Sequence, residues 1–411
     1  MRVTSEIVPG PETSSSPTWL ERETARLHTD SPRLAAGLQH LAERPALVLL
    51  PLAVVILGTL GAVVPGGDAE WFRIAGLSML GPRLLDVFGA PGLQIGPLYL
   101  LSLGAATAAT DWLPEPSMRF VLAAGQGALV LAYALAVTRR AASATGARAL
   151  PAQWAVGLAL VLGGLLAESV GNGHPEEILL GLLLAHAALE AARARPRTVG
   201  VLLALAVAVK IWGVLGAPVA LVGRRPRTVV VAGAVGGLLA ALVYGPFFLW
   251  GDVQTFSFSW GIPQETVLAR VVGPEASDWG LRVAQAGVAV ATGAAVALRR
   301  AGSPLTVVLA VIGTRLLLDP LFLTYYAGPF LVVALLWAWT SNARPGPALR
   351  AACWSLVPTT VLVPYLLDRT VSLVTLRLVV VVVAVVALIL DRRATRPGLP
   401  VLGGPDVVST P

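Results

Sequence analysis

Long apolar runs constrain the fold of this chain more than any other feature. Runs of about 17–25 apolar residues recur, and a helix of that length crosses about 30 Å of hydrocarbon. Charged residues make up 13% of the 411 residues, against about 25% in soluble domains. Because lipid cannot satisfy backbone polar groups, we expect an all-α, polytopic transmembrane bundle of about 11–13 membrane helices. The candidate spans are 46–64, 93–109, 118–138, 154–167, 176–192, 198–222, 228–249, 279–298, 304–318, 321–340, 351–367 and 371–390.

Arginine-rich segments indicate the orientation of these spans. Short basic loops lie on the cytoplasmic side by the positive-inside rule. A polar amino-terminal tail (1–45) and a carboxy-terminal tail (391–411) join them there, and we expect both to be largely disordered. The transmembrane domain is then 46–390, with 65–92 as an outer-face loop and the 168–175 turn on the same face. The basic segments are 139–148, 193–197, 224–227, 299–300, 344–350 and 392–396.

Two spans fit this topology poorly. The rule demands an even number of crossings between the amino-terminal tail and Arg139, yet three spans are visible there. The 93–109 span is the weakest, and it either crosses or turns back to the same side. Residues 198–222 carry arginines at both ends, so we predict two half-helices that turn near Lys210. The long 250–278 loop is expected on the outer face.

Residue counts exclude several classes of site. The single cysteine, Cys353, lies in an apolar span and the four histidines are scattered, so no cysteine or histidine metal cluster is predicted. A requirement for a divalent metal stays open. The net charge of +7 comes mostly from arginines in short loops, which is typical of topology signals rather than nucleic-acid binding. Walker, Rossmann, HExxH and GxSxG motifs are absent from the sequence.

The stretch after the first span carries the first candidate for chemistry. Asp68 follows this span, and Glu70 and Arg73 come directly after it. An acidic residue at a helix mouth is often only a polar boundary. Alternatively, Asp68 acts as a general base on a hydroxyl, while Arg73 and Arg83 hold a phosphate. The segment 69–88 is predicted to form an interfacial amphipathic helix.

The turn between the spans 154–167 and 176–192 is the second candidate. It reads Glu168-Ser-Val-Gly-Asn-Gly-His-Pro-Glu-Glu177. A helix cap explains the glycines, the proline and the acidic first turn. The alternative is a sugar-binding site, since this turn gathers many hydrogen-bonding groups, on Asn172, His174, Glu176 and Glu177.

Buried charges inside apolar spans are the third candidate. Lys210 lies within about 25 apolar residues, where an ionisable group is a functional hypothesis by default. Its structural alternatives are an ion pair with Glu168 or snorkelling beside Trp212, and its functional role would be to face a lipid-linked phosphate. Arg315 and Asp319 are four residues apart, which suits a plain intrahelical pair. With Tyr325 and Tyr326 they also place a cation, an acid and two phenols near the outer face.

The order of these elements resembles the GT-C glycosyltransferases. The closest resemblance is to the polyprenyl-phosphate-mannose-dependent family 87, once catalogued as an integral membrane family of unknown function. An acidic residue after the first membrane helix is shared with that superfamily. Family 87 also has a Gly-Gln-x-Asn turn, an apolar helix, a basic loop, a lysine-bearing helix and an arginine-rich loop. Here that order reads Gly171-Asn-Gly-His174, 176–192, Arg193–Arg197, Gly200 to Lys210, and Arg224–Arg227.

The resemblance implies a function and assigns roles. Asp68 would be the catalytic base, and outer-face groups would bind a polyprenyl-phosphate sugar, the donor substrate, and a glycan or glycolipid acceptor. The reaction would be an inverting hexose transfer, with mannose as the expected sugar, at the plasma membrane. Asn172 stands where the family usually has glutamine, and Gly96-Pro97 where it often has Tyr-Pro-Pro.

Two other functions remain open. A transporter or lipid flippase would use Lys210, Glu168 and the Arg315–Asp319 pair along a midplane pathway. A membrane scaffold would need none of these groups. The depth of the polar groups in the membrane discriminates between the glycosyltransferase and the transporter. Polar groups gathered at one outer cavity favour transfer chemistry, and groups spread across the midplane favour transport.

Overall fold

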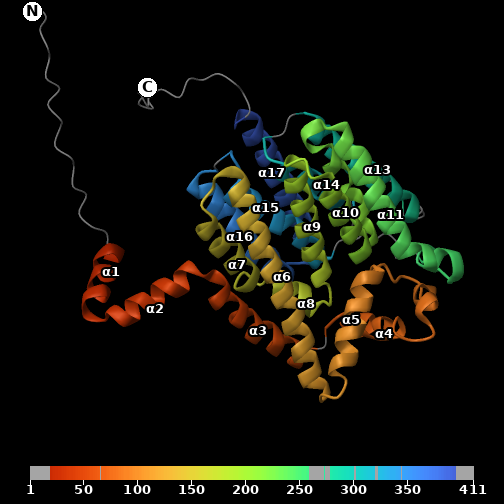
Figure 1. Cartoon of the computed structure of the whole chain (residues 1–411), viewed down its shortest axis with the longest axis horizontal. Helices are drawn as coiled ribbons and strands as arrows, with labels where there is room; N and C mark the ends of the chain where they lie inside the picture. Colours follow the sequence, from red (N-terminus) through yellow and green to blue (C-terminus); the bar gives the residue numbers. More distant parts are fainter. Residues whose placement is uncertain are drawn as a thin grey trace, which may run out of the picture. The chain divides into compact units, whose positions relative to one another are not determined.

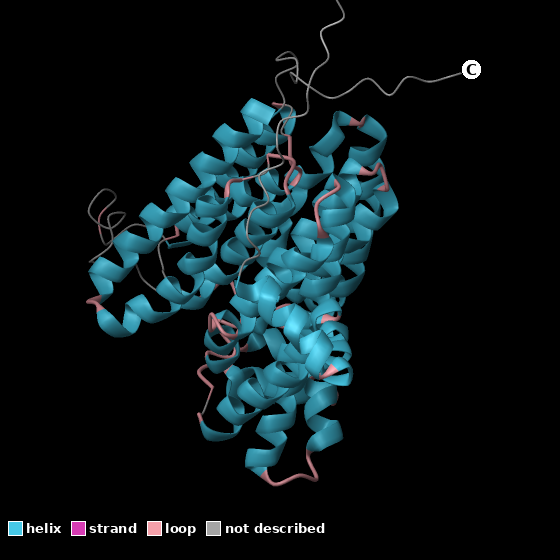
Figure 2. Cartoon of the chain, turned by 90° about the vertical axis from the view of Figure 1, so that its left-hand side faces the viewer, coloured by secondary structure: helices cyan, strands magenta, loops and turns pink. Residues whose placement is uncertain are grey.

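The protein is all-α over the residues that the structure describes. This computed structural model describes residues 19–64, 66–258, 273, 278–299, 302–319, 323–343 and 345–394, and the described residues form helices joined by loops, with no strand (Figure 2). Most of the predicted 250–278 loop (259–272 and 274–277) and most of the 391–411 tail (395–411) lie outside these residues. Contacts divide the chain into two units, one ending at Val48 and one beginning at Leu49.

The first unit contains two polar helices, α1 (Trp19–Asp30) and α2 (Pro32–Glu43). The expectation that the whole 1–45 tail is disordered is therefore wrong for these residues. Helix α2 repeats leucine at helical spacing, at Leu34, Leu38 and Leu41, and this pattern favours an amphipathic helix. Residues 1–18 lie outside the described part of the chain.

The second unit is a bundle of apolar helices (Figure 1). Several helices begin with a proline in their first turn, where the missing N–H group costs no hydrogen bond. The helices are α3 (Pro45–Val63), α4 (Ala69–Ser78), α5 (Pro97–Thr110), α6 (Glu115–Thr145), α7 (Ala149–Val161), α8 (Leu165–Gly171), α9 (Pro175–Ala192), α10 (Pro196–Val209), α11 (Pro226–Trp250), α13 (Asp278–Leu298), α14 (Leu305–Leu317), α15 (Gly328–Thr340), α16 (Pro347–Leu366) and α17 (Arg369–Ala394), with 3₁₀ helices η1 (Leu84–Gly89), η2 (Ile211–Arg224) and η3 (Thr324–Ala327).

The bundle confirms the predicted class of polytopic membrane protein. Among the described residues, 5 helices are long and apolar enough to cross a membrane, or up to 6 if the bent pair α7–α8 forms one span. Helices α5, α10 and α14 are apolar but shorter. The expected number of about 11–13 membrane helices stays a prediction.

Helix α9 lies at the centre of the bundle. It packs against α6, α10, α14, α15 and η2, and nearly all of its residues are buried. Its charged residues are confined to its two ends, with Glu176 and Glu177 in the first turn and Glu190 in the last. Glu176 and Glu190 are fourteen residues apart, about 21 Å along a helix. The long apolar stretch of α9 therefore separates two charged clusters.

The loop between α3 and α5 folds differently from the prediction. The single helix expected over 69–88 is interrupted, because α4 ends at Ser78 and the chain turns at Gly81-Pro82 before η1. Proline lacks the N–H group that a continuing helix needs. The predicted apolar face is nevertheless present: Phe72, Ala75 and Met79 are buried in a small cluster with η1 and α5.

The predicted break at Lys210 is confirmed. Helix α10 ends at Val209 and η2 begins at Ile211, with Lys210 in an extended conformation between them. The backbone of Lys210 pairs with Ile95 in an antiparallel bridge, and the Gly96 amide donates to the Val209 carbonyl at 2.9 Å. The segment before α5 therefore satisfies backbone groups that the break leaves open.

Candidate functional site

A cavity of about 320 Å³ lies where the α3–α4 turn, the α8–α9 turn and the Lys210 break meet. Its wall combines aromatic rings with ionisable and amide side chains. It is lined by Gly67, Asp68, Trp71, Phe72, Gly92, Gln94, Ile95, Asn172, His174, Lys210, Leu323, Tyr325 and Tyr326. We call it the Asp68 cavity.

Asp68 sits at the amino terminus of α4 and is held by the turn before α9. Its amide donates to the Asn172 carbonyl at 3.1 Å, and its Oδ2 lies 3.0 Å from His174 Nε2. Gly173 permits this approach: its φ is +82°, and a Cβ there would lie 2.4 Å from the Ala69 amide nitrogen. The Asp68 side chain is 46% exposed, so it is the accessible end of the network.

His174 connects Asp68 to a buried glutamate. Its Nδ1 lies 2.7 Å from Glu176 Oε1, and its ring stacks on Tyr325 with centroids 4.0 Å apart. Each ring nitrogen faces a carboxylate oxygen, so both contacts are hydrogen bonds only if both nitrogens carry a proton. The ring with two N–H groups is the imidazolium form of His174. Burial opposes this charge, but Glu176 and the hydrogen bonds to Asp68 and Glu176 outweigh it, and the net effect is a raised His174 pKa.

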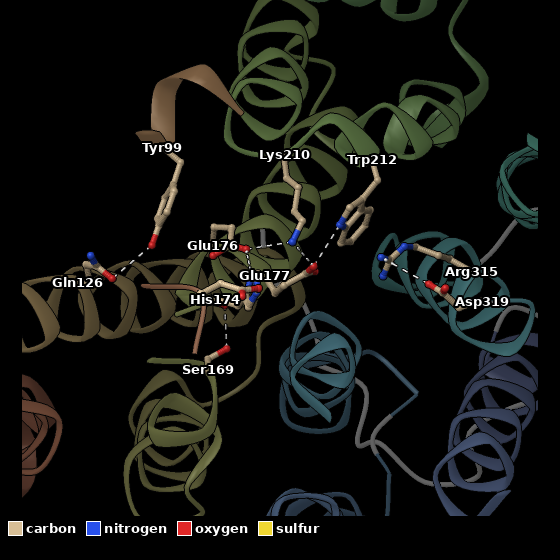
Figure 3. A network of polar contacts seen from close by, with 11 residues as sticks. Tyr99, Gln126, Ser169, His174, Glu176, Glu177, Lys210, Trp212, Arg315 and Asp319 are labelled. Carbon is tan, nitrogen blue, oxygen red and sulfur yellow. Dashed lines mark hydrogen bonds and ion pairs between the residues drawn. The ribbon is translucent and has the colours of Figure 1, made fainter. Parts of the chain in front are cut away.

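Lys210 completes the network from the opposite side (Figure 3). Its Nζ donates to Glu176 Oε1 at 3.0 Å and to Glu177 Oε1 at 2.7 Å. Both glutamate side chains are fully buried, and the Trp212 indole N–H lies 3.4 Å from Glu177 Oε1. Buried charges need such partners.

The expected pairing of Lys210 with Glu168 is wrong. Glu168 instead accepts hydrogen bonds from Thr324 and from Tyr365. Gly164, in the left-handed conformation with φ +81°, precedes α8, and α8 is bent by 40° from α7. This bend starts a new helix, so the direction of Glu168 does not follow from the periodicity of α7.

The network carries a net negative charge. With His174 protonated, the cations His174 and Lys210 face three carboxylates, Asp68, Glu176 and Glu177. The sum is −1. For a hydroxyl-rich group, Asp68 offers a hydrogen-bond acceptor and the aromatic rings offer flat apolar faces.

Asn172 supports the turn as well as lining the cavity. Its side-chain amide donates to the Glu168 carbonyl at 2.8 Å, which closes the last turn of α8. The hydrogen bond thus uses one of the two amide protons that were expected to bind sugar.

Arg315 and Asp319 lie beside the network rather than in the cavity wall. Their charged groups are 3.6 Å apart, which confirms the predicted ion pair, although α14 ends at Leu317 and Asp319 lies beyond it. The Arg315 guanidinium lies 4.1 Å from the centre of the Trp212 ring and 4.8 Å from that of Tyr326, distances typical of cation–π contacts. These contacts position Trp212, which contacts Glu177, and Tyr326, whose ring faces Lys210.

Glu70 and Arg73 face a different cavity. Arg73 donates to both carboxylate oxygens of Glu70, at 2.8 and 2.5 Å. This hydrogen bonding from Arg73 lowers the pKa of Glu70. Arg83 is exposed and lines neither cavity, so the expected phosphate clamp of Arg73 and Arg83 is not brought together.

Gln94, which lines the Asp68 cavity, and Trp212, which contacts Glu177, were not selected from the sequence as site residues. Trp212 is two residues after the selected Lys210, so its position in the chain was the available signal. Gln94 lies in the extended segment before α5, for which periodicity carries no information.

No group of three or more His, Cys, Asp or Glu side chains suited to a metal ion occurs among the described residues. No model of a known protein family matches the chain, and no curated protein is significantly similar to it.

Proposed function

We propose that the protein is an integral membrane glycosyltransferase that transfers a hexose, with mannose the first sugar to test, from a polyprenyl-phosphate donor. The observation that carries this proposal is the position of Asp68. It is a half-exposed carboxylate at a cavity of about 320 Å³, hydrogen-bonded at 3.0 Å to His174. A hydrogen-bonded, accessible carboxylate is what a general base requires.

The chemistry follows from the charges of the network. Asp68 removes the proton from an acceptor hydroxyl while the oxygen attacks the anomeric carbon. The bond from that carbon to the phosphate oxygen breaks, and the lipid phosphate leaves with the bonding electrons. The new bond forms on the opposite face, so the configuration inverts. The Asp68–His174–Glu176 group changes from −1 to 0 as Asp68 takes the proton.

His174 and Glu176 act as positioning residues in this scheme. The Glu176 carboxylate fixes the His174 ring through Nδ1, and His174 in turn directs Nε2–H at Asp68. This hydrogen bond orients the Asp68 carboxylate. Lys210 is the cation that faces the buried Glu176 and Glu177 carboxylates.

The site would open on the extracytoplasmic face of the plasma membrane. The arginine-rich segments near Arg193 and Arg225 follow the ends of α9 and η2 that are remote from His174 and Lys210, and the positive-inside rule places those ends in the cytoplasm. The partners would then be membrane lipids, a lipid-linked sugar and a glycan or glycolipid acceptor.

A transporter or flippase is the second candidate, and the gathering of the charges at one end of α9 supports it less than it supports transfer chemistry. Five ionisable side chains gather at one end of α9. Between them and Glu190 the buried face of α9 is apolar apart from the half-buried His186, with Leu180, Leu182 and Leu184 fully buried. A transport path would need hydrated polar groups along this stretch.

The test is transfer of labelled mannose from polyprenyl-phosphate-mannose in membranes containing the wild type or Asp68→Ala. Label that reaches a lipid or glycan acceptor only with the wild type supports the proposal. No transfer from a panel of lipid-linked sugars, together with uptake of a solute, would replace it with the transporter.

A further inference from the structure

A second cavity of about 260 Å³ lies on the other side of the α3–α4 turn. It is bounded by α3, α4, α5, α6 and α8, and Gly67 lines both cavities. A ligand in this second cavity would therefore be separated from Asp68 only by the turn of main chain that carries it. The lining residues used below are Leu122, Gln126, Glu70, Arg73, Arg119 and Tyr99.

The second cavity has an apolar wall and a polar end. Val64, Leu103, Leu122, Ala123 and Val170 form the apolar wall. Glutamate, arginine, glutamine and tyrosine side chains form the polar end. This division suits an amphipathic ligand, with a hydrogen-bonding head and an apolar continuation.

The polar end carries no net charge. Arg73 is paired with Glu70 at 2.5 Å, and Arg119 is paired with Glu115. An anionic head would have to displace one of these carboxylates from its arginine. An uncharged head can instead use the hydrogen-bonding positions that the ion pairs leave open.

Gln126 supplies a directed donor at this end (Figure 3). The Tyr99 hydroxyl donates to Gln126 Oε1 at 3.3 Å, which orients the side-chain amide. The NH₂ group of Gln126 is then the part available to a ligand. This group only donates hydrogen bonds, so the ligand must supply an acceptor. A hydroxyl or ring oxygen is a suitable acceptor.

Size and access restrict the ligand further. Sites for drug-sized ligands are about 300–1,000 Å³, so the second cavity accommodates about one sugar ring rather than an oligosaccharide. Two of its walls, α3 and α6, are candidate membrane spans. A ligand whose tail remains in lipid can reach such a site laterally.

We infer that the second cavity binds the uncharged, polyhydroxylated head of a lipid, with room for a single ring. Asp68 lines the neighbouring cavity and not this one, so the head would lie beside the proposed reaction centre rather than at its carboxylate. The binding itself does not depend on transfer.

The test is binding of tritiated octyl β-glucoside to the purified full-length protein in phosphatidylcholine nanodiscs, without any donor. Octyl phosphate and octanol serve as competitors. Gln126→Leu removes the amide, and Leu122→Trp fills the cavity from its apolar wall. Gln153→Leu is the matched control, since Gln153 donates to the Leu135 carbonyl on α6 and lines neither cavity. Melting temperatures identify variants that fold.

The wild type is expected to bind octyl glucoside saturably, at least tenfold more tightly than octyl phosphate or octanol. Gln126→Leu and Leu122→Trp should each weaken this binding at least tenfold, whereas Gln153→Leu and Asp68→Asn leave it unchanged. Tighter binding of octyl phosphate, or loss of binding with Asp68→Asn but not with Gln126→Leu, overturns the inference. Absence of sugar transfer does not, so the two proposals fail separately.

Discussion

Replacing Lys210 with methionine tests the buried network most sharply. Lys210 is the cation that faces both Glu176 and Glu177, at 3.0 and 2.7 Å. Methionine keeps the apolar stem but removes the charge, so the network changes from −1 to −2. Glu176 retains His174 as a partner. Among the described residues, Glu177 then keeps only the 3.4 Å contact with Trp212.

Removing one partner of a buried ion pair destabilises a protein by about 3–5 kcal/mol. The entropy of unfolding is about 2 cal/mol/K per residue, or roughly 0.9 kcal/mol/K for this chain of 411 residues. Lys210→Met should therefore lower the melting temperature by about 4–6 °C. Intrinsic tryptophan fluorescence of the purified protein in detergent measures this shift.

Second substitutions identify the unpaired carboxylate. Lys210→Met combined with Glu177→Gln removes the charge that has lost its partner, so at least half of the lost stability should return. Lys210→Met combined with Glu176→Gln should return less, because it also removes the partner of His174. A melting temperature unchanged by Lys210→Met, or equal rescue by both glutamines, would refute the reasoning.

Three further predictions concern His174 and two glycines of the site. The pKa of His174 is raised above its ordinary value of 6.5, so the stabilising positive charge on His174 is complete below pH 6.5 and is lost as the pH rises through the raised pKa. Over this pH range the melting temperature of the wild type should fall, whereas that of His174→Gln should stay level. Gly173→Ala forces a left-handed residue and a 2.4 Å contact, so it should destabilise by about 1–3 kcal/mol, whereas Gly125→Ala, which meets nothing within 4 Å, should be neutral or stabilising in the same melting assay. Gly96→Ala places a Cβ 2.1 Å from the Ala208 carbonyl and should lower the melting temperature by breaking the pairing with Val209; a melting curve identical to the wild type would contradict the observed geometry.

The sequence predicts the helices better than it predicts their contacts. Apolar runs and arginine-rich loops predict the class of fold, and arginines at both ends of 198–222 predict the break at Lys210. The number of crossings does not follow, because α10 and α14 are only 14 and 13 residues long. Their ends depend on packing within the bundle, which periodicity does not report.

The candidate site was predicted in part. Asp68, Asn172, His174, Lys210 and Tyr325 do line one cavity, with Glu176 directly behind. Glu70 and Arg73 do not, and helix geometry explains why: they are two and five residues after Asp68, which places both on roughly the opposite side of α4 at about 100° per residue.

The partners of Lys210 could not be predicted. The choice of Glu176 and Glu177 over Glu168 for Lys210 depends on the bend between α7 and α8. That bend arises at Gly164, which adopts the left-handed conformation. Many glycines in membrane helices do not adopt it, so the glycine alone does not predict the bend. Spacing in the sequence therefore identified the Arg315–Asp319 pair but not the partners of Lys210.

The role of Asp68 is the central claim, and one measurement tests it directly. Single-turnover transfer of labelled sugar by purified, reconstituted protein should be compared between the wild type, Asp68→Asn and Asp86→Asn. Asp86 is an exposed acid on η1 of the same loop and lines neither cavity. The account predicts that Asp68→Asn lowers the rate at least 100-fold, as expected for loss of a general base, while Asp86→Asn transfers at the wild-type rate. Equal rates for all three proteins would contradict the account.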